Sequence, residues 1–231
     1  GETWEEHGIV GLKKEDAGGE QLFDRVLHTV PAAVKDRLNT GFTQRLLKRV
    51  RPDSTLYRRE DLQVDTLFDA VDAAEALNVP VFSPNTYYHR KFIGFELGFG
   101  KDTVRRDLEA EHAYRRTETE DAISGDAALV MSHFFYPDTF QHLYPRDEEK
   151  RAAMYRRMDD LAGELRDAAE DRFDTVIFMS DHGLPTKDAH NENAFYSCNH
   201  ALFPDTEPHI TDFHDTILHH LDTDDTTGLD I

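Results

Sequence analysis

The chain has 231 residues, 39% of them hydrophobic, so it is long enough to form a domain with a substantial core. Its formal net charge is −20, from 46 acidic and 26 basic residues. Proteins that bind nucleic-acid backbones need a basic surface, so this charge argues against DNA or RNA as a partner. No apolar run approaches the roughly 20 residues that a transmembrane helix requires.

The acidic residues are spread over the whole chain, and Arg outnumbers Lys by about two to one. This composition is typical of salt-adapted proteins, in which high ionic strength screens the repulsion between like charges. We therefore predict a halophilic protein, with an ordinary acidic protein as the alternative. Cys198 is the single cysteine, which excludes an intramolecular disulfide and is compatible with a reducing compartment. We predict a cytoplasmic location, with a leader upstream of Gly1 as the alternative.

Apolar periodicity and turn residues predict alternating helices and strands along the chain. The predicted helices are 31–50, which could also be a pair of helices, 66–77, 102–123, 147–171 and 210–221. The predicted strands are 79–82, 127–135, 176–180 and 194–197. Thr211 is a plausible N-cap of the last helix, and residues 222–231 form an acidic tail. Helices that alternate with nearly continuous apolar strands predict one α/β domain over residues 1–231.

Two of the predicted buried strands are each followed by a carboxylate and an imidazole. Asp181 and His182 come directly after one strand, and Asp138 and His142 follow the other. A single helical turn would bring Asp138 and His142 together, because residues i and i+4 share one face. Open α/β sheets hold ligands at the carboxyl ends of their strands, and this donor pair suits Zn²⁺, Mn²⁺ or a related ion. Two metal-binding pairs are therefore predicted; alternatively, Asp181 caps a helix and His182 is a surface residue.

Four motifs resemble, in the same order, those of the alkaline phosphatase superfamily, and within it the type I phosphodiesterase/nucleotide pyrophosphatase branch. They are HGIVG at residues 7–11, LFD with VPVFSPNTY between residues 67 and 87, PDTFQH at residues 137–142 and SDHG at residues 180–183. Together they cover almost the whole chain. The resemblance implies an alkaline phosphatase-like three-layer α/β/α sandwich around a mostly parallel sheet.

The resemblance also implies two divalent metal ions that clamp a phosphoryl group, with Zn²⁺ as the first expectation and Mn²⁺ or Mg²⁺ as alternatives. One ion would take Asp138, His142 and a later histidine. His190 is the first choice for this third ligand, because it lies in a loop just before a predicted strand, and His200 is the alternative.

The second ion would take Asp181 and His182, together with an aspartate and a Thr or Ser nucleophile. In the family these last two partners precede the HGIVG segment with which this chain begins. We therefore expect an N-terminally incomplete fold, with the nucleophile upstream of Gly1.

Three residues between the predicted strand at 79–82 and the charged helix are implied as substrate-binding. They are Asn85, Thr86 and Tyr87, although a structural turn explains them equally well.

The implied function is metal-dependent hydrolysis of a phosphoester, in which a Thr or Ser forms a covalent phosphoenzyme that water then cleaves. The substrate would be a small-molecule, lipid or nucleotide phosphoester. We expect the complete protein to be active and the 231-residue chain to be inactive. The alternatives are a sulfatase of the same superfamily and a metal-binding module without catalytic activity.

Overall fold

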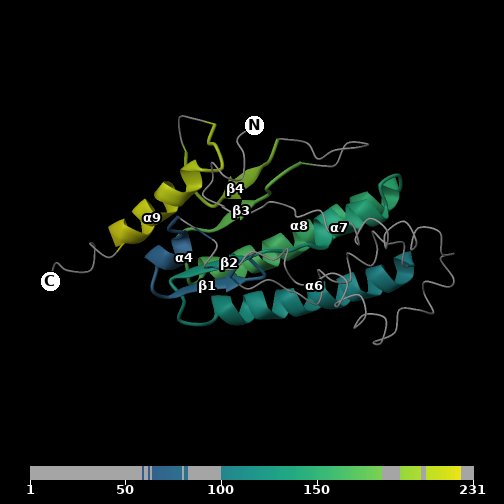
Figure 1. The fold of residues 1–231 in the computed structure, drawn as a ribbon, viewed down its shortest axis with the longest axis horizontal. Coiled ribbons are helices and arrows are strands. Elements are labelled where there is room, and N and C mark those ends of the chain that lie inside the picture. The colour runs from purple at the N-terminus through teal and green to yellow at the C-terminus, as the bar shows by residue number, and fades with distance from the viewer. Residues whose placement is uncertain are drawn as a thin grey trace, which may run out of the picture. The chain divides into compact units, whose positions relative to one another are not determined.

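The computed structural model describes residues 59, 62, 64–79, 81–82, 100–183, 193–203 and 207–224. The predicted helix at 31–50 lies outside these residues. The described elements, in chain order, are α4 (Leu67–Ala70), β1 (Ala74–Leu77), α6 (Lys101–Ile123), β2 (Leu129–Ser132), α7 (Tyr136–Leu143), α8 (Glu148–Glu170), β3 (Ile177–Met179), β4 (Tyr196–Cys198) and α9 (Asp212–Asp224) (Figure 1). Within the described part, no helix is both long enough and apolar enough to cross a membrane.

The chain divides into two compact units. The first comprises Gly1–Val64, Ala76–Glu118 and Met131–Pro145, and the second comprises Asp65–Glu75, Thr119–Val130 and Arg146–Ile231. The division passes through α6, β1 and β2. The single domain expected over residues 1–231 stays a prediction.

Strands β1 and β2 form a two-stranded parallel sheet. The backbone N–H of Ala128 donates to the carbonyl of Ala73 at 2.8 Å, and the N–H of His133 donates to the carbonyl of Leu77 at 2.9 Å. The partners advance in the same direction along both strands, which defines a parallel pair. Parallel strands need a long crossover connection, and α6 lies within it. The mixture of helices and strands with this short parallel sheet confirms the α/β fold class.

The prediction of one helix over residues 66–77 is wrong beyond Ala70. Helix α4 ends there, and residues that favour a helix in isolation, such as Leu77, lie in β1 instead. Pairing with β2 supplies backbone hydrogen bonds that outweigh this weak local preference. The predicted strand at 79–82 is also wrong, because Asn78 and Val81 have φ angles of 58° and 75°, a left-handed backbone that interrupts an extended chain.

The helices predicted near residues 102–123 and 147–171 are confirmed by α6 and α8. In α8, Asp147 is the N-cap, and its carboxylate accepts a hydrogen bond from the backbone N–H of Lys150 at 3.1 Å. The buried side chains of α8 recur at helical spacing; they are Met154, Leu161, Leu165 and Ala169. The C-terminal helix is also confirmed as α9, which begins directly after Thr211 and continues through Asp224, so the first residues of the expected tail are helical.

The strand predicted at residues 176–180 is present as β3, but the prediction that it is buried is wrong. Strand β3 pairs antiparallel with β4, with Ile177 opposite Cys198 and Met179 opposite Tyr196. Ile177 is half-buried, and Met179 is 39% exposed. Strand β4 is the one partner of β3 in the described sheets, so no strand covers its second edge there.

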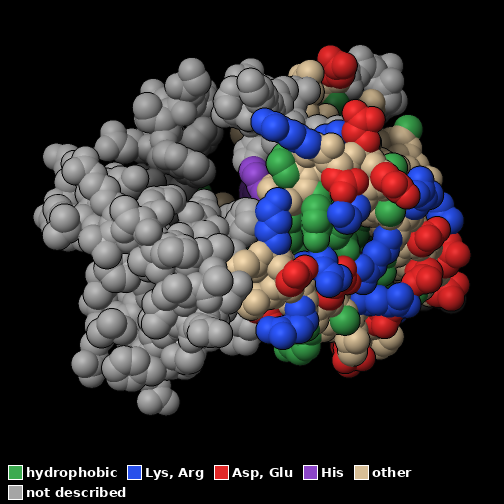
Figure 2. All heavy atoms as spheres, turned by 90° about the vertical axis from the view of Figure 1, so that its right-hand side faces the viewer, with side chains coloured by type: hydrophobic (Ala, Val, Ile, Leu, Met, Phe, Trp, Pro, Cys, Tyr) green, Lys and Arg blue, Asp and Glu red, His purple; other side chains and the backbone are tan. Residues whose placement is uncertain are grey.

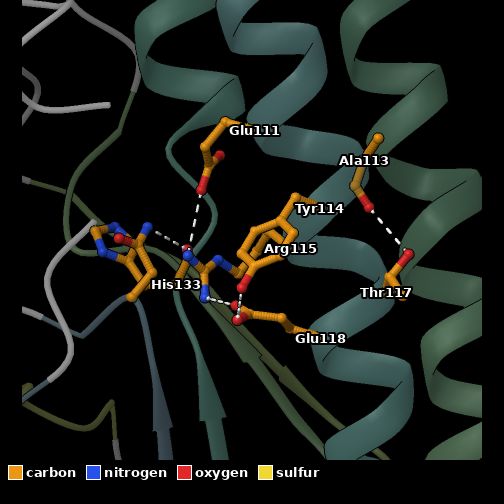
Figure 3. Close-up of polar contacts among 8 residues, drawn as sticks. Glu111, Ala113, Tyr114, Arg115, Thr117, Glu118 and His133 are labelled. Atoms are coloured by element: carbon orange, nitrogen blue, oxygen red, sulfur yellow. Dashed lines mark hydrogen bonds and ion pairs between the residues drawn. The ribbon is translucent and has the colours of Figure 1, made fainter. Parts of the chain in front are cut away.

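A partly buried charged network lies on one face of α6 (Figure 3). The side chain of Arg115 is 4% exposed and lies between Glu111 and Glu118, with N···O distances of 3.4 Å and 2.5 Å. Tyr114 also donates to Glu118, which raises the pKa of the Tyr114 phenol. Buried charges are tolerated when each has a partner of opposite sign, so this face depends on Arg115.

Exposed charges on the same helix have a smaller role. Figure 2 shows Lys and Arg side chains intermixed with Asp and Glu over the described part of the face that it draws. The side chain of Arg106, for example, is 74% exposed and lies 3.9 Å from Asp107. Because the Arg106 end of this pair is exposed to water, the pair should contribute about 0–1 kcal/mol.

Replacing Arg115 with alanine should therefore lower the free energy of unfolding by about 3–5 kcal/mol, because Glu111 would keep its buried charge without this partner. Urea denaturation followed by circular dichroism measures the change. The matched control is Arg106→Ala on the same helix, which should change stability by less than about 1 kcal/mol. Equal losses in the two variants would contradict this account of α6.

The N-cap of α8 should respond to pH. The side chain and backbone N–H of Lys150 hydrogen-bond Asp147 and lower the pKa of its carboxyl group below the usual value. Because the native pKa is the lower one, this contribution is present above the unfolded pKa of about 3.9 and is lost as the pH falls through the native pKa. Hydrogen exchange at neutral pH should show weaker protection of the first turn of α8 in Asp147→Ala. No such change is expected for Asp159→Ala in the middle of the helix, and the effect of Asp147→Ala should disappear in acid.

Candidate metal centre

Helix α7 carries the first predicted metal pair. Pro137 occupies its first turn, where a missing N–H costs nothing, and Asp138 lies in the same turn, where the helix dipole favours a negative charge. Five of the eight residues of α7 are buried: Tyr136, Thr139, Phe140, Gln141 and Leu143. The side chains of Asp138 and His142 are 34% and 36% exposed, although the Oδ1 atom of Asp138 is itself buried.

The structure brings Asp138 and His142 together, as a single helical turn predicts. Oδ1 of Asp138 lies 3.3 Å from Nε2 of His142. Two ligands that each lie about 2.0–2.2 Å from a tetrahedral ion are roughly 3.3–3.6 Å apart. The distance between the two atoms therefore matches that between two ligands of one ion. The role of the two residues as a ligand pair stays a prediction.

The second predicted pair follows β3. Oδ1 of Asp181 lies 3.6 Å from Nε2 of His182, and the two side chains are 80% and 26% exposed. Nδ1 of His182 lies 3.0 Å from the carbonyl oxygen of Gly183, which can only accept, so Nδ1 carries the proton. This contact selects Nε2, the nitrogen nearer Asp181, as the one that can ligate a metal.

Of the remaining predicted site residues, His200 is the one that the structure describes. His190, Asn85, Thr86 and Tyr87 lie outside the described residues, as does the HGIVG segment. His200 is described and exposed, with Nε2 2.9 Å from the hydroxyl of Thr175. Among the described residues, no three His, Cys, Asp or Glu side chains come together as a metal site. The pairs on α7 and after β3 lie in different compact units.

The family profile for type I phosphodiesterase / nucleotide pyrophosphatase matches residues 1–214. The chain belongs to this family. The resemblance noted in the sequence is thereby confirmed, and the chain is a member of a family of phosphoester hydrolases. Comparisons with characterised proteins and with solved structures give no significant match.

In this phosphodiesterase-family chain, the loop that leads to α7 is fixed by the end of β1. The N–H of His133 donates to the carbonyl of Leu77 at 2.9 Å, and Nδ2 of Asn78 donates to the carbonyl of His133, also at 2.9 Å. Asn78 is 1% exposed and has a left-handed backbone, which asparagine adopts more readily than most residues. The sequence marked Asn78 as the end of a helix, and nothing in it pointed to this clamp across 55 positions.

Both ends of α7 are also held by α6. Tyr136, which is 3% exposed, donates its hydroxyl to Oε1 of Glu109 at 2.9 Å, and its ring centroid lies 4.4 Å from that of the buried His112. At the other end, Nζ of Lys101 donates to the carbonyl of Leu143 at 3.0 Å. A cation at the last carbonyls of a helix is favourable to the helix dipole. These contacts fix α7, and with it the spacing of the first pair.

Substitutions at Asn78 should separate the contribution of its side-chain hydrogen bond from that of its left-handed backbone. Asn78→Gly keeps the left-handed backbone but removes the donor to His133, which should cost about 1–3 kcal/mol of unfolding free energy. Asn78→Ala also introduces backbone strain and should cost about 1–2 kcal/mol more. Urea denaturation measures both. Equal stability of the two variants would contradict this account, because it would show that an alanine side chain at position 78 does not strain the left-handed backbone.

Proposed function

We propose that the protein hydrolyses phosphodiesters with two divalent metal ions, one held by Asp138, His142 and His190 and the other by Asp181 and His182. The observation that carries the proposal is the 3.3 Å separation of Asp138 Oδ1 and His142 Nε2 in a chain of this family. Zn²⁺ is the first expectation, with Mn²⁺ and Mg²⁺ as alternatives.

The donor chemistry supports this assignment. Each pair offers one carboxylate oxygen and one imidazole nitrogen, the combination that suits Zn²⁺ or Mn²⁺ better than an all-oxygen cation. When bound, such ions neutralise the charge that develops on a transferring phosphoryl group. Neutral imidazole is required for ligation, and the contact of His182 with Gly183 selects the tautomer that leaves Nε2 towards Asp181.

The residues around the pairs have separate roles in the proposal. The side chains of Asp138 and His142 are about one-third exposed, and the Oδ1 atom of Asp138 that would ligate the ion is buried. Asn85, Thr86 and Tyr87 are proposed to contact the leaving group. The Thr or Ser nucleophile is expected ahead of the HGIVG segment, and this stays a prediction. The proposed substrate is a small-molecule, lipid or nucleotide phosphoester.

Hydrolysis of bis-p-nitrophenyl phosphate tests the proposal, with the 231-residue chain and an upstream-extended form assayed side by side in Zn²⁺ or Mn²⁺. In the active form, EDTA should abolish turnover and Zn²⁺ should restore it. Asp138→Asn and His142→Ala should each lower activity by at least the roughly 10–100-fold that outer-shell partners of a metal cost.

The matched control for these variants is His219→Ala, an exposed histidine of α9 that should leave activity unchanged. Turnover that resists EDTA, or full activity of Asp138→Asn, would refute the two-metal proposal. Faster cleavage of p-nitrophenyl sulfate than of the phosphodiester would favour the sulfatase alternative. Turnover by the 231-residue chain alone would refute the prediction that its nucleophile lies upstream.

A further inference from the structure

A second group of histidines lies at the end of the β3/β4 hairpin; it includes His200, the alternative third ligand of the first ion, but none of the residues that the proposed function assigns to either ion. Its base is Asn199. Nδ2 of Asn199 donates to the carbonyl of Asp174 at 3.0 Å, and its Oδ1 accepts from the N–H of Val176 at 3.0 Å. The N–H of Asn199 also donates to the carbonyl of Val176 at 3.2 Å. Three hydrogen bonds therefore fix the residue that immediately precedes His200.

The ring of His200 is oriented by a further contact. Its Nε2 lies 2.9 Å from the hydroxyl of Thr175. Thr175 lies between Asp174 and Val176, the two residues to which Asn199 is hydrogen-bonded. His200 makes no other hydrogen bond with the described part of the chain. When Nε2 carries the proton and donates it to that hydroxyl, Nδ1 is the nitrogen that can ligate a metal. A polar partner on one ring nitrogen is the usual way to orient an imidazole whose other nitrogen binds a metal.

Helix α9 is packed against the same hairpin (Figure 1). Phe213, in its first turn, is 7% exposed, and its ring centroid lies 5.2 Å from that of Tyr196 in β4 and 5.0 Å from that of Phe203. His220 follows Phe213 by seven residues, which is two helical turns and so the same face of the helix. The aromatic contacts at Phe213 thus turn His220 towards the end of the hairpin.

The ring centroids of His200 and His220 lie 5.3 Å apart, with an angle of 62° between the ring planes. Because a metal lies about 2.0–2.1 Å from an imidazole nitrogen, two rings on one tetrahedral ion have their centroids roughly 5 Å apart. The observed spacing matches this value. We propose that His200 and His220 form a two-imidazole site for a divalent transition metal such as Zn²⁺, Ni²⁺ or Cu²⁺.

The class of ligand follows from the donors. Imidazole nitrogens favour Zn²⁺, Ni²⁺ and Cu²⁺ over Mg²⁺ or Ca²⁺. No third His, Cys, Asp or Glu joins the pair within the described residues. The ion would link the hairpin to α9, and because it binds the folded protein it would stabilise that junction in proportion to its concentration. The proposal does not depend on the phosphodiesterase site.

Equilibrium dialysis with Ni²⁺ tests the site in the full chain. Asp138→Asn and Asp181→Asn are combined as the background, so that the two pairs of the proposed active site contribute little. One Ni²⁺ should bind saturably, and His200→Ala or His220→Ala should each weaken binding by at least about tenfold. The matched control is His219→Ala, the neighbouring residue on α9, which should bind Ni²⁺ as the background does.

Cu²⁺ bound to the same proteins provides a spectroscopic readout. Electron paramagnetic resonance should show coupling to two imidazole nitrogens in the background protein and to one in either single variant. Binding should weaken between pH 8 and pH 5.5, because protons compete with the metal for imidazole. Undiminished Ni²⁺ affinity in His220→Ala, or an equal loss in His219→Ala, would overturn the proposal. If His220→Ala does not fold, His200→Asn at the exposed hairpin end gives the same decision.

Discussion

The candidate site on α7 depends on how the chain leaves β2. Consecutive residues at the end of β1 hold both backbone groups of His133, since Leu77 accepts its N–H and the Asn78 amide donates to its carbonyl. If the pairing of β1 with β2 were the only constraint, it would end at the hydrogen bond between His133 and Leu77. The residues after His133 could then take any direction that sterics allow. The buried amide of Asn78 extends the pairing by one residue beyond the strand. Asp138 then follows from a fixed point after a short connection.

Helix α6 holds α7 in place at both of its ends. It contacts α7 through Glu109 and His112 at Tyr136, and through Lys101 at Leu143. These contacts are polar or aromatic and directional, whereas apolar burial would also permit small rotations of α7 about its own axis. Rotation matters because Asp138 and His142 share one face, and a metal site tolerates little displacement of its ligands.

The sequence predicted the α/β class, the long helices and the i, i+4 pairing of Asp138 with His142, because each rests on local periodicity. It misplaced residues 66–82, where Leu77 has a helical preference and pairing with β2 decides the outcome. It also could not show that Asn78 reaches His133, since a contact between distant positions leaves no local pattern. The spacing of His200 and His220 is unpredictable for the same reason.

The two pairs after β2 and β3 differ in how well they are prepared for an ion. Asp138 and His142 lie on successive turns of an anchored helix, and both side chains are about one-third exposed. Asp181 follows a half-buried strand, and its carboxylate is 80% exposed. An exposed carboxylate loses more rotamer freedom and more hydration when it ligates a metal. Under the proposed function, the α7 pair would therefore take up its ion more readily, and the second ion would rely more on its other ligands.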